Sequence, residues 1–325
     1  MRTRWIPRIG VVVLFALVLV PLDTRTRAAS PDDTQRSPFL WKIEGNGPPT
    51  YLYGTIHVPA PRVTELPSAV KAAFGASQAV FTEIRMDSAT QMGVQARVML
   101  PDDQHLKDVV GQPLFDRLSK AVDRSLPKDA PPAVGTMLAS LLDRMKPWAA
   151  MSYVELLEFL PDMMAGRQAL DAMLYDQAQK DGKEVGALET VDEQLAVFEG
   201  FTNEEQARML KLTLDSMDEA AAKKKSPTED LIKGYLSGDL AKLSLMMTES
   251  MRLDPVLFGK FSVRAVDERN KLMVERLLVK RAERPDKTCF FAVGALHYAG
   301  ETGIIGLLRK KGLTVTRVTE PPPQR

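Results

Sequence analysis

Two of the three histidines in the chain close the same short motif. It reads Gly54-Thr55-Ile56-His57 near the N-terminus and Gly294-Ala295-Leu296-His297 near the C-terminus. An apolar run precedes each glycine, so each histidine is predicted to lie just beyond a strand, and the second run is typical of a strand buried on both faces. Ligands usually bind at the edge where the strands of an open α/β sheet end. Both imidazoles are therefore candidates for metal ligation or proton transfer.

Two glutamates stand at comparable positions. Glu83 lies at the end of the apolar run 78–84, and Glu189 directly follows the run 183–188. If these strands are parallel neighbours of the one that ends before His297, the carboxylates converge with the histidines. Two imidazoles with one or two carboxylates are a sufficient ligand set for zinc, manganese or cobalt. Such a metal lowers the pKa of a bound water toward neutrality and so generates a hydroxide nucleophile.

A purely structural interpretation fits the same residues. A histidine at a strand end is often held by hydrogen bonds, a glutamate there often caps a helix, and one GxxH motif is a weak signal. No short ligand spacing such as HExxH joins the two histidines. The third histidine, His105, has polar neighbours and is predicted to be exposed. At this point both interpretations stay open.

The elements that must position these residues follow from periodicity and turn signals. The runs 39–44 and 50–54, separated by a Gly/Pro turn, predict a hairpin, and 68–74 predicts a short helix. The segment of about 87–181 is mostly helical, and whether it caps the sheet or forms its own lobe stays open. A capping box of Thr202 and Glu205 starts a further helix. The stretch 288–318 predicts strand, loop, helix and strand, a parallel crossover unit. The fold class is therefore α/β with a mixed central sheet and a large helical insertion.

Composition excludes several function classes. The 325 residues are 45% hydrophobic and 26% charged, which is typical of a globular protein, and the net charge of +1 gives no reason to expect a nucleic-acid partner. Cys289 is the only cysteine, so no intramolecular disulfide can form, and its apolar surroundings predict a buried side chain. The chain has no Gly-x-Ser-x-Gly elbow, phosphate-binding glycine loop or dinucleotide fingerprint.

The N-terminus has the layout of an export signal. Three arginines precede an uncharged apolar run over 9–20, and small residues follow at 28–30. We therefore expect a signal peptide over 1–29, a flexible segment over 30–37, one α/β domain over 38–319 and a disordered tail over 320–325. The apolar run is shorter than a spanning helix needs, so the periplasm or the exterior is expected, and an uncleaved membrane anchor is the less favoured alternative.

Several blocks of the sequence, taken in order, resemble the TraB/GumN family, which is related to the Tiki metalloproteases. The resemblance rests on the two GxxH motifs with Glu83 between them. It extends over further segments from about 39 to 318: Lys146-Pro147-Trp148, Leu170-Asp171, 182–190 with Gln194-Leu195, Glu268-Arg269-Asn270, and the close through Gly300, Gly303, Leu308 and Gly312. The combination is far more specific than either GxxH motif alone.

The resemblance implies a ChaN/erythromycin-esterase-like core and a metal-dependent hydrolase site. Carried onto this chain, it makes His57 and His297 metal ligands and Glu83 a third ligand or the general base. Arg269 would hold an oxyanion, and Glu189 would complete the ligand set or support a ligand histidine. Arg85 departs from the family, which more often has an acidic residue there.

Two functions follow from the resemblance. The first is an exported hydrolase of peptide or ester bonds that depends on manganese, cobalt or zinc. The alternative is a non-catalytic protein that captures a peptide, a metal or an iron-containing ligand such as haem in the same cleft. Substrate and oligomeric state are not predicted by the sequence.

Overall fold

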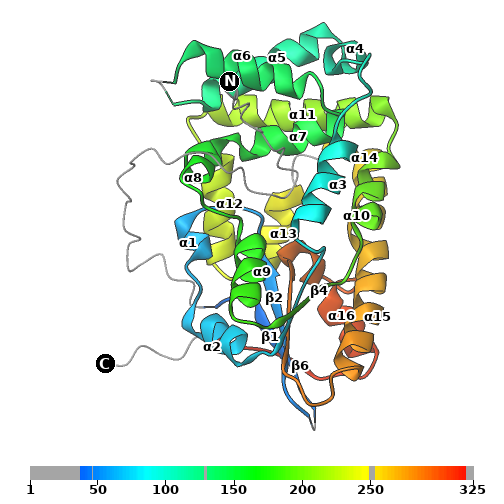
Figure 1. Ribbon diagram of the computed structural model, residues 1–325. Coiled ribbons are helices and arrows are strands. Elements are labelled where there is room, and N and C mark those ends of the chain that lie inside the picture. The colour runs from blue at the N-terminus through cyan, green and yellow to red at the C-terminus, as the bar shows by residue number, and fades with distance from the viewer. Residues whose placement is uncertain (1–36, 46, 128–129, 249–252, 320–325) are drawn as a thin grey trace, which may run out of the picture.

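A computed structural model describes residues 37–45, 47–127, 130–248 and 253–319 (Figure 1). The predicted signal peptide, most of the predicted flexible segment and the predicted tail lie outside the described residues. Within the described part of the chain, no helix has both the length and the apolar character needed to cross a membrane.

One six-stranded mixed sheet forms the centre of the protein, in the order β4-β3-β5-β2-β1-β6. Its strands are β1 (Leu40–Ile43), β2 (Thr50–Thr55), β3 (Ala79–Thr82), β4 (Glu184–Ala187), β5 (Cys289–Gly294) and β6 (Val315–Arg317). Strands β4, β3, β5 and β2 are parallel, whereas β1 pairs antiparallel with both β2 and β6. The α/β class, the N-terminal hairpin and the parallel direction of the predicted strands are thus confirmed. The last strand is parallel to β5 but is separated from it by the hairpin.

Helices cover both faces of the sheet and the edge at which its parallel strands end (Figure 1). Near the sheet lie α1 (Pro61–Thr64), α2 (Ser68–Ala76), α9 (Leu170–Lys180), α10 (Val191–Glu199), α12 (Pro227–Leu236), α13 (Leu240–Thr248), the π-helix η4 (Val263–Asp267), α15 (Glu268–Ala282), the 3-10 helix η5 (Ala295–Tyr298) and α16 (Ile304–Lys310). Beyond the strand ends lie α3 (Ser88–Val98), α4 (Leu106–Val110), α5 (Gln112–Ser125), α6 (Pro132–Leu142), α7 (Pro147–Leu156), the 3-10 helix η2 (Leu157–Phe159), α8 (Leu160–Met164), α11 (Asn203–Ala222) and α14 (Pro255–Ser262).

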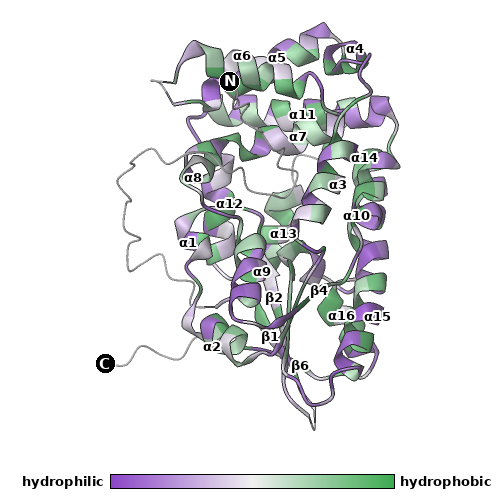
Figure 2. Cartoon of the chain, in the orientation of Figure 1, coloured by the Kyte–Doolittle hydropathy of each residue, from purple (hydrophilic) through white to green (hydrophobic). Residues whose placement is uncertain are grey.

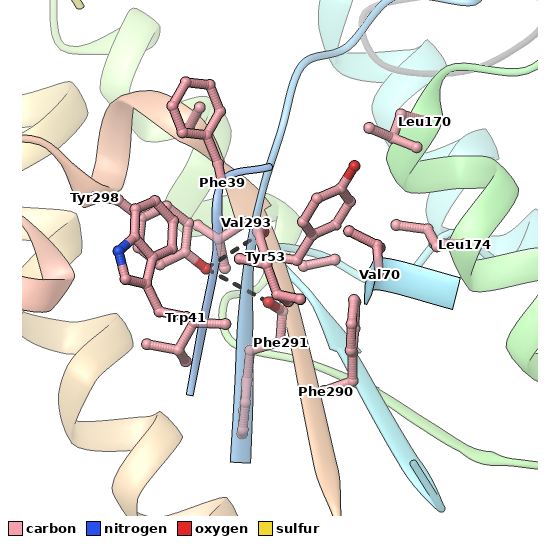
Figure 3. Close-up of a cluster of buried hydrophobic side chains, with 14 of the residues drawn as sticks. Phe39, Trp41, Tyr53, Val70, Leu170, Leu174, Phe290, Phe291, Val293 and Tyr298 are labelled. Carbon is pink, nitrogen blue, oxygen red and sulfur yellow. Dashed lines mark hydrogen bonds between the residues drawn. The ribbon is translucent and has the colours of Figure 1, made fainter. Parts of the chain in front are cut away.

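The sheet is buried because its central strand carries aromatic side chains on both faces. Phe290 packs edge-on against Phe74 of α2, and Phe291 stacks on Phe81 with the ring centroids 4.9 Å apart. Alternation along β5 sends these two neighbours to opposite faces, where α2 and α9 cover one side and α15 the other (Figure 1). Figure 3 shows the cluster around them. The sequence prediction of a strand buried on both faces is confirmed, and Cys289 at its start is buried as expected.

A second hydrophobic core lies between the helices beyond the strand ends. Trp148 of α7 is fully buried there, together with Leu210 and Leu214 of α11. Helix α11 comes from outside the segment 87–181, yet it packs against α7, α5 and α4, while α9 from inside that segment packs on β3 and β4. Hydrophilic and hydrophobic residues occupy different faces of many of these helices (Figure 2). The helical layer therefore has its own core, placed opposite the carboxyl ends of the parallel strands (Figure 1).

Candidate functional site

Four turns at the carboxyl ends of β2, β3, β4 and β5 carry the polar residues of the site. His57 follows β2, Glu83 follows β3, Glu189 follows β4, and His297 lies in η5 directly after β5. The carbonyl of Glu83 accepts hydrogen bonds from the backbone N–H groups of Leu188 and Glu189, which ties two of these turns together. The parallel register of the four strands thus brings residues far apart in sequence to one edge.

Glu83 is buried and has a hydrogen-bond partner on each oxygen. Its Oε1 accepts from the backbone N–H of Gly294 at 2.7 Å. Its Oε2 accepts from the Arg269 guanidinium at 2.6 Å and from the side-chain amide of Gln194 at 3.0 Å. The imidazole Nε2 of His297 stands 3.9 Å from Oε1, too far for a hydrogen bond. Both oxygens of Glu83 are therefore held by the protein, and Oε1 is the one nearer His297.

Most N–H groups of the Arg269 guanidinium donate hydrogen bonds to acceptors within the protein. Its Nε and terminal nitrogen bind the Glu189 carboxylate at 2.6–3.1 Å, and the same terminal nitrogen reaches Glu83. The other terminal nitrogen donates to the carbonyl of Ala265 in the π-helix at 3.2 Å. A π-turn adds a residue to the helix and is frequent at functional sites. This π-turn lies directly before α15, which begins with Glu268-Arg269-Asn270, and both Arg269 and Asn270 reach the site.

Each site histidine is fixed by a buried partner on Nδ1. Nδ1 of His57 lies 3.0 Å from a carboxylate oxygen of Asp171, which stands in the first turn of α9. Nδ1 of His297 lies 2.7 Å from the side-chain oxygen of Asn270. The ring of His57 is 39% exposed, whereas His297 is buried. This leaves the Nε2 atom of each ring for other contacts, as is usual for metal-ligating histidines with a supporting partner.

Gly294 marks the point where the three groups meet. A Cβ atom at this position would lie 3.0 Å from Oε1 of Glu83, 3.6 Å from the ring of His297 and 3.7 Å from Nε2 of His57. Because both rings border the same point, the two imidazoles lie well within the ~10 Å beyond which a metal with ~2 Å bonds could not join them. A side chain at position 294 would fill the space between Glu83 and the two histidines, so the glycine of the second motif keeps this space open.

The glycine of the first motif has a different role. A Cβ atom at Gly54 would lie 2.9 Å from Cβ of Phe39 and 3.3 Å from Cα of Ala295. The carbonyl of Gly54 also accepts a hydrogen bond from the buried hydroxyl of Tyr235. Gly54 therefore lets β2 approach its neighbours closely and does not border the three converging groups.

The surroundings of Glu83 and Glu189 shift the pKa values of the two carboxylates in opposite directions. Burial on its own would raise the pKa of Glu83, but the charges of Arg269, His297 and His57 and the N–H of Gly294 hold this pKa well below its usual range. Glu83 is therefore ionised over the whole physiological range and is a weak proton acceptor. Burial raises the pKa of Glu189, and this effect outweighs the hydrogen bonds and the charge of Arg269.

The pKa values of the two site histidines are also shifted in opposite directions. Burial lowers the pKa of His57, but the neighbouring Asp171 carboxylate outweighs it and raises the pKa to about 9. Burial and the positive charge of Arg269 lower the pKa of His297 to about 3. Without a metal, His57 is therefore a cation at neutral pH and His297 is a neutral imidazole. A metal that binds both rings must displace the proton of His57.

The residue types fit a divalent metal, although the described structure is not closed around one. Nε2 of His297 and Oε1 of Glu83 are unbonded to each other at 3.9 Å, close to the span of two ~2 Å metal bonds. Across the described ranges, however, no group of three His, Cys, Asp or Glu side chains is arranged to hold a metal ion. Ligation by all three groups would therefore require side-chain movement.

The structure brings together five of the residues singled out in the sequence: His57, Glu83, Glu189, Arg269 and His297. Arg85 is not among them, because its side chain is 55% exposed and pairs with Asp87. His105 lies elsewhere, part-buried against Asp143. Sequence reasoning assigned no role to the three partners that hold the site, Asp171, Gln194 and Asn270. Each stands in a block that carries the family resemblance, which was the available signal.

A parallel α/β edge that joins two GxxH histidines to a buried Glu–Arg pair defines a class of site, and the sequence comparisons place the chain in a family. The chain belongs to the TraB/PrgY/gumN family, whose model matches residues 39–317.

Similar curated proteins carry one name. Metalloprotease TIKI1 of Homo sapiens is 28% identical over 346 residues, covering 93% of this chain and 68% of that protein. The metalloprotease TIKI homolog of Nematostella vectensis is 29% identical over 86% of this chain and 67% of its own length. Metalloprotease TIKI1 of Danio rerio is 30% identical over 85% of this chain and 62% of its own length. No solved structure matches the chain.

Proposed function

We propose that this protein is a metal-dependent hydrolase of peptide bonds, with esters as the related substrate class. The observation that carries the proposal is the convergence of His57, His297 and Glu83 around Gly294. The three relatives described above, each named a metalloprotease, support the same activity. His57 and His297 would bind a divalent metal through Nε2, and Glu83 would bind it through Oε1.

A manganese, cobalt or zinc ion at this position would lower the pKa of a bound water and polarise the scissile carbonyl. Glu83 contributes a permanent negative charge, which Arg269 and Gln194 hold in place. The low pKa of Glu83 favours a ligand role over the general-base role. Arg269 was expected to contact an oxyanion. Because its N–H groups already donate to Glu83 and Glu189, we propose instead that it holds these two carboxylates in place.

We also propose that the protein is exported, because a basic segment, a short apolar run and small residues follow one another at its N-terminus. The substrate would then be a peptide or small molecule outside the cytoplasm, with no nucleic-acid partner.

A mutational assay tests the proposed hydrolase directly. A peptide and ester library should be cleaved only when Mn²⁺, Co²⁺ or Zn²⁺ is present. His57→Ala and His297→Ala should each lower kcat/KM by at least about 100-fold, because a lost ligand costs at least as much as a lost supporting residue. His105→Ala, which alters the histidine outside the site, is the matched control and should retain activity. Full activity in rigorously metal-free protein would refute the proposal.

One observation favours a second candidate, a ligand-binding protein without turnover. Glu83 already has its charge paired with Arg269, and the described residues form no closed three-ligand group. In that case a peptide, metal or haem ligand would bind in a manner that depends on His297, while no substrate class would be hydrolysed. Metal-dependent turnover in the library assay would exclude this candidate.

A further inference from the structure

Two of the three histidines have a carboxylate as the partner of Nδ1, and the third has an amide. A carboxylate holds His57, through Asp171, and His105, through Asp143 at 2.9 Å. His297 instead meets the neutral side chain of Asn270 at 2.7 Å. An amide can face a ring nitrogen with its oxygen or with its NH₂ group, so the orientation of Asn270 determines which nitrogen of His297 carries the proton.

The second contact of Asn270 fixes that orientation. Its Nδ2 lies 2.9 Å from the backbone carbonyl of Thr302, which can only accept a hydrogen bond. The amide nitrogen must therefore face Thr302, and the amide oxygen must face His297. An oxygen acceptor requires a donor opposite it, so Nδ1 of His297 carries a hydrogen. Asn270 has no exposed surface, so water cannot replace either contact without opening the core.

On the other side of the ring, Nε2 has no hydrogen bond to any residue that the structure describes. Nε2 of His297 is 3.9 Å from Oε1 of Glu83, which already accepts the N–H of Gly294. That distance is too long for a hydrogen bond, so Glu83 does not hold a proton on Nε2. The contact with Asn270 alone therefore fixes which ring nitrogen carries a hydrogen.

We propose that Asn270 is a positioning residue that fixes a hydrogen on Nδ1 of His297 and so leaves Nε2 as the ring nitrogen available to a ligand. Nε2 belongs to the ring that borders the point where Glu83 and His57 converge. The consequence for metal binding rests on the proposed function, whereas the assignment of the tautomer does not.

The site also explains why an amide suits this position better than a carboxylate. Glu83 and Glu189 already share one guanidinium. Asn270→Asp would add a further buried carboxylate beside Glu83, Glu189 and Asp171, and would set one of its oxygens against the carbonyl of Thr302. Asn270 provides the acceptor for His297 without either effect.

Nitrogen-15 NMR of histidine-labelled, metal-free protein tests the assignment at neutral pH. With three histidines in the chain, His57→Gln and His105→Gln identify the signals. His297 should show a protonated Nδ1 in the wild type. An unprotonated Nδ1 would overturn the proposal without any variant at 270 having to fold.

Variants then test the role of Asn270. In folded Asn270→Ala, the His297 signals should move toward a mixture of tautomers, while Asp143→Asn should affect only His105. Unchanged His297 signals in Asn270→Ala would also overturn the proposal. The affinity for Co²⁺ should fall about 10–100-fold in Asn270→Ala. Wild-type protein that binds no Co²⁺ but shows the expected tautomer would refute the proposed function and leave the role of Asn270 intact.

Discussion

At the scale of the residue, the site depends on one guanidinium shared between two buried carboxylates. Arg269 is only 13% exposed, and Glu83 and Glu189 both depend on it for charge compensation. Its fork geometry allows Nε and a terminal nitrogen to bind Glu189 together, which a lysine could not reproduce. Arg269 therefore sets the position of Glu83 before any ligand arrives.

Removal of that guanidinium should destabilise the fold. We expect Arg269→Met to lower the free energy of unfolding by about 3–5 kcal/mol, because it leaves buried carboxylates without a partner. The matched control is Arg85→Met, whose side chain is exposed and paired only at the surface, and it should change stability by less than about 1 kcal/mol. Urea unfolding monitored by circular dichroism measures both. Equal effects of the two variants would contradict the assigned role of Arg269.

Sequence reasoning found the residues that end strands, and Arg269, but gave no role to Asp171, Gln194 and Asn270. A histidine after an apolar run and a glycine is visible locally, and so are Glu83 and Glu189. Asp171 is 114 positions from His57, and no local pattern shows that the two will meet. Such pairings depend on how α9 packs on the sheet, which periodicity does not specify.

At the scale of the element, two identical motifs serve the fold in two ways. The glycine of β2 allows close packing against Phe39 and Ala295, while the glycine of β5 leaves room between Glu83 and the histidines. The sequence could not separate the roles of the two glycines, because these roles depend on which strands become neighbours. The parallel centre of the sheet was predictable from buried runs, whereas the place of the hairpin between β5 and β6 was not.

Alanine substitution tests the packing role of Gly54. Gly54→Ala should destabilise the protein by about 1–3 kcal/mol, since its methyl group would overpack a core contact. The control is Gly93→Ala in α3, where nothing lies within 4 Å and the helix should gain about 1 kcal/mol. Thermal denaturation of both variants measures the difference. A neutral Gly54→Ala would show that β2 does not pack as described.

At the scale of the whole molecule, ion pairs far from the site join the sheet edge to the helices. Glu184 at the start of β4 accepts hydrogen bonds from Arg284 at 2.5 and 2.9 Å and from Lys287 at 3.0 Å. These hydrogen bonds, that of Arg284 first, lower the pKa of Glu184 to about 2. They connect the start of β4 to the segment between α15 and β5, at the end of the strands opposite the site.

The lowered pKa predicts a specific acid response. Glu184 contributes stability above its ordinary pKa of 4.5, and this contribution is lost as the pH falls through about 2. Glu184→Gln should therefore melt below the wild type at pH 7, and the gap between the two should close in acid. Glu283→Gln, on a more exposed partner of the same arginine, is the control and should show a smaller gap at pH 7. A gap that persists unchanged at pH 2 would contradict this prediction.

The family membership, the fold and the converging side chains all lead to one claim, that His57 and His297 hold a single divalent metal. Titration of metal-free protein with Co²⁺, followed by its visible absorption, tests this claim most directly. We predict one Co²⁺ per chain in the wild type and in His105→Ala, and loss of that saturable binding in both His57→Ala and His297→Ala. Absence of binding in the wild type, or binding that survives in both site variants, would contradict the account.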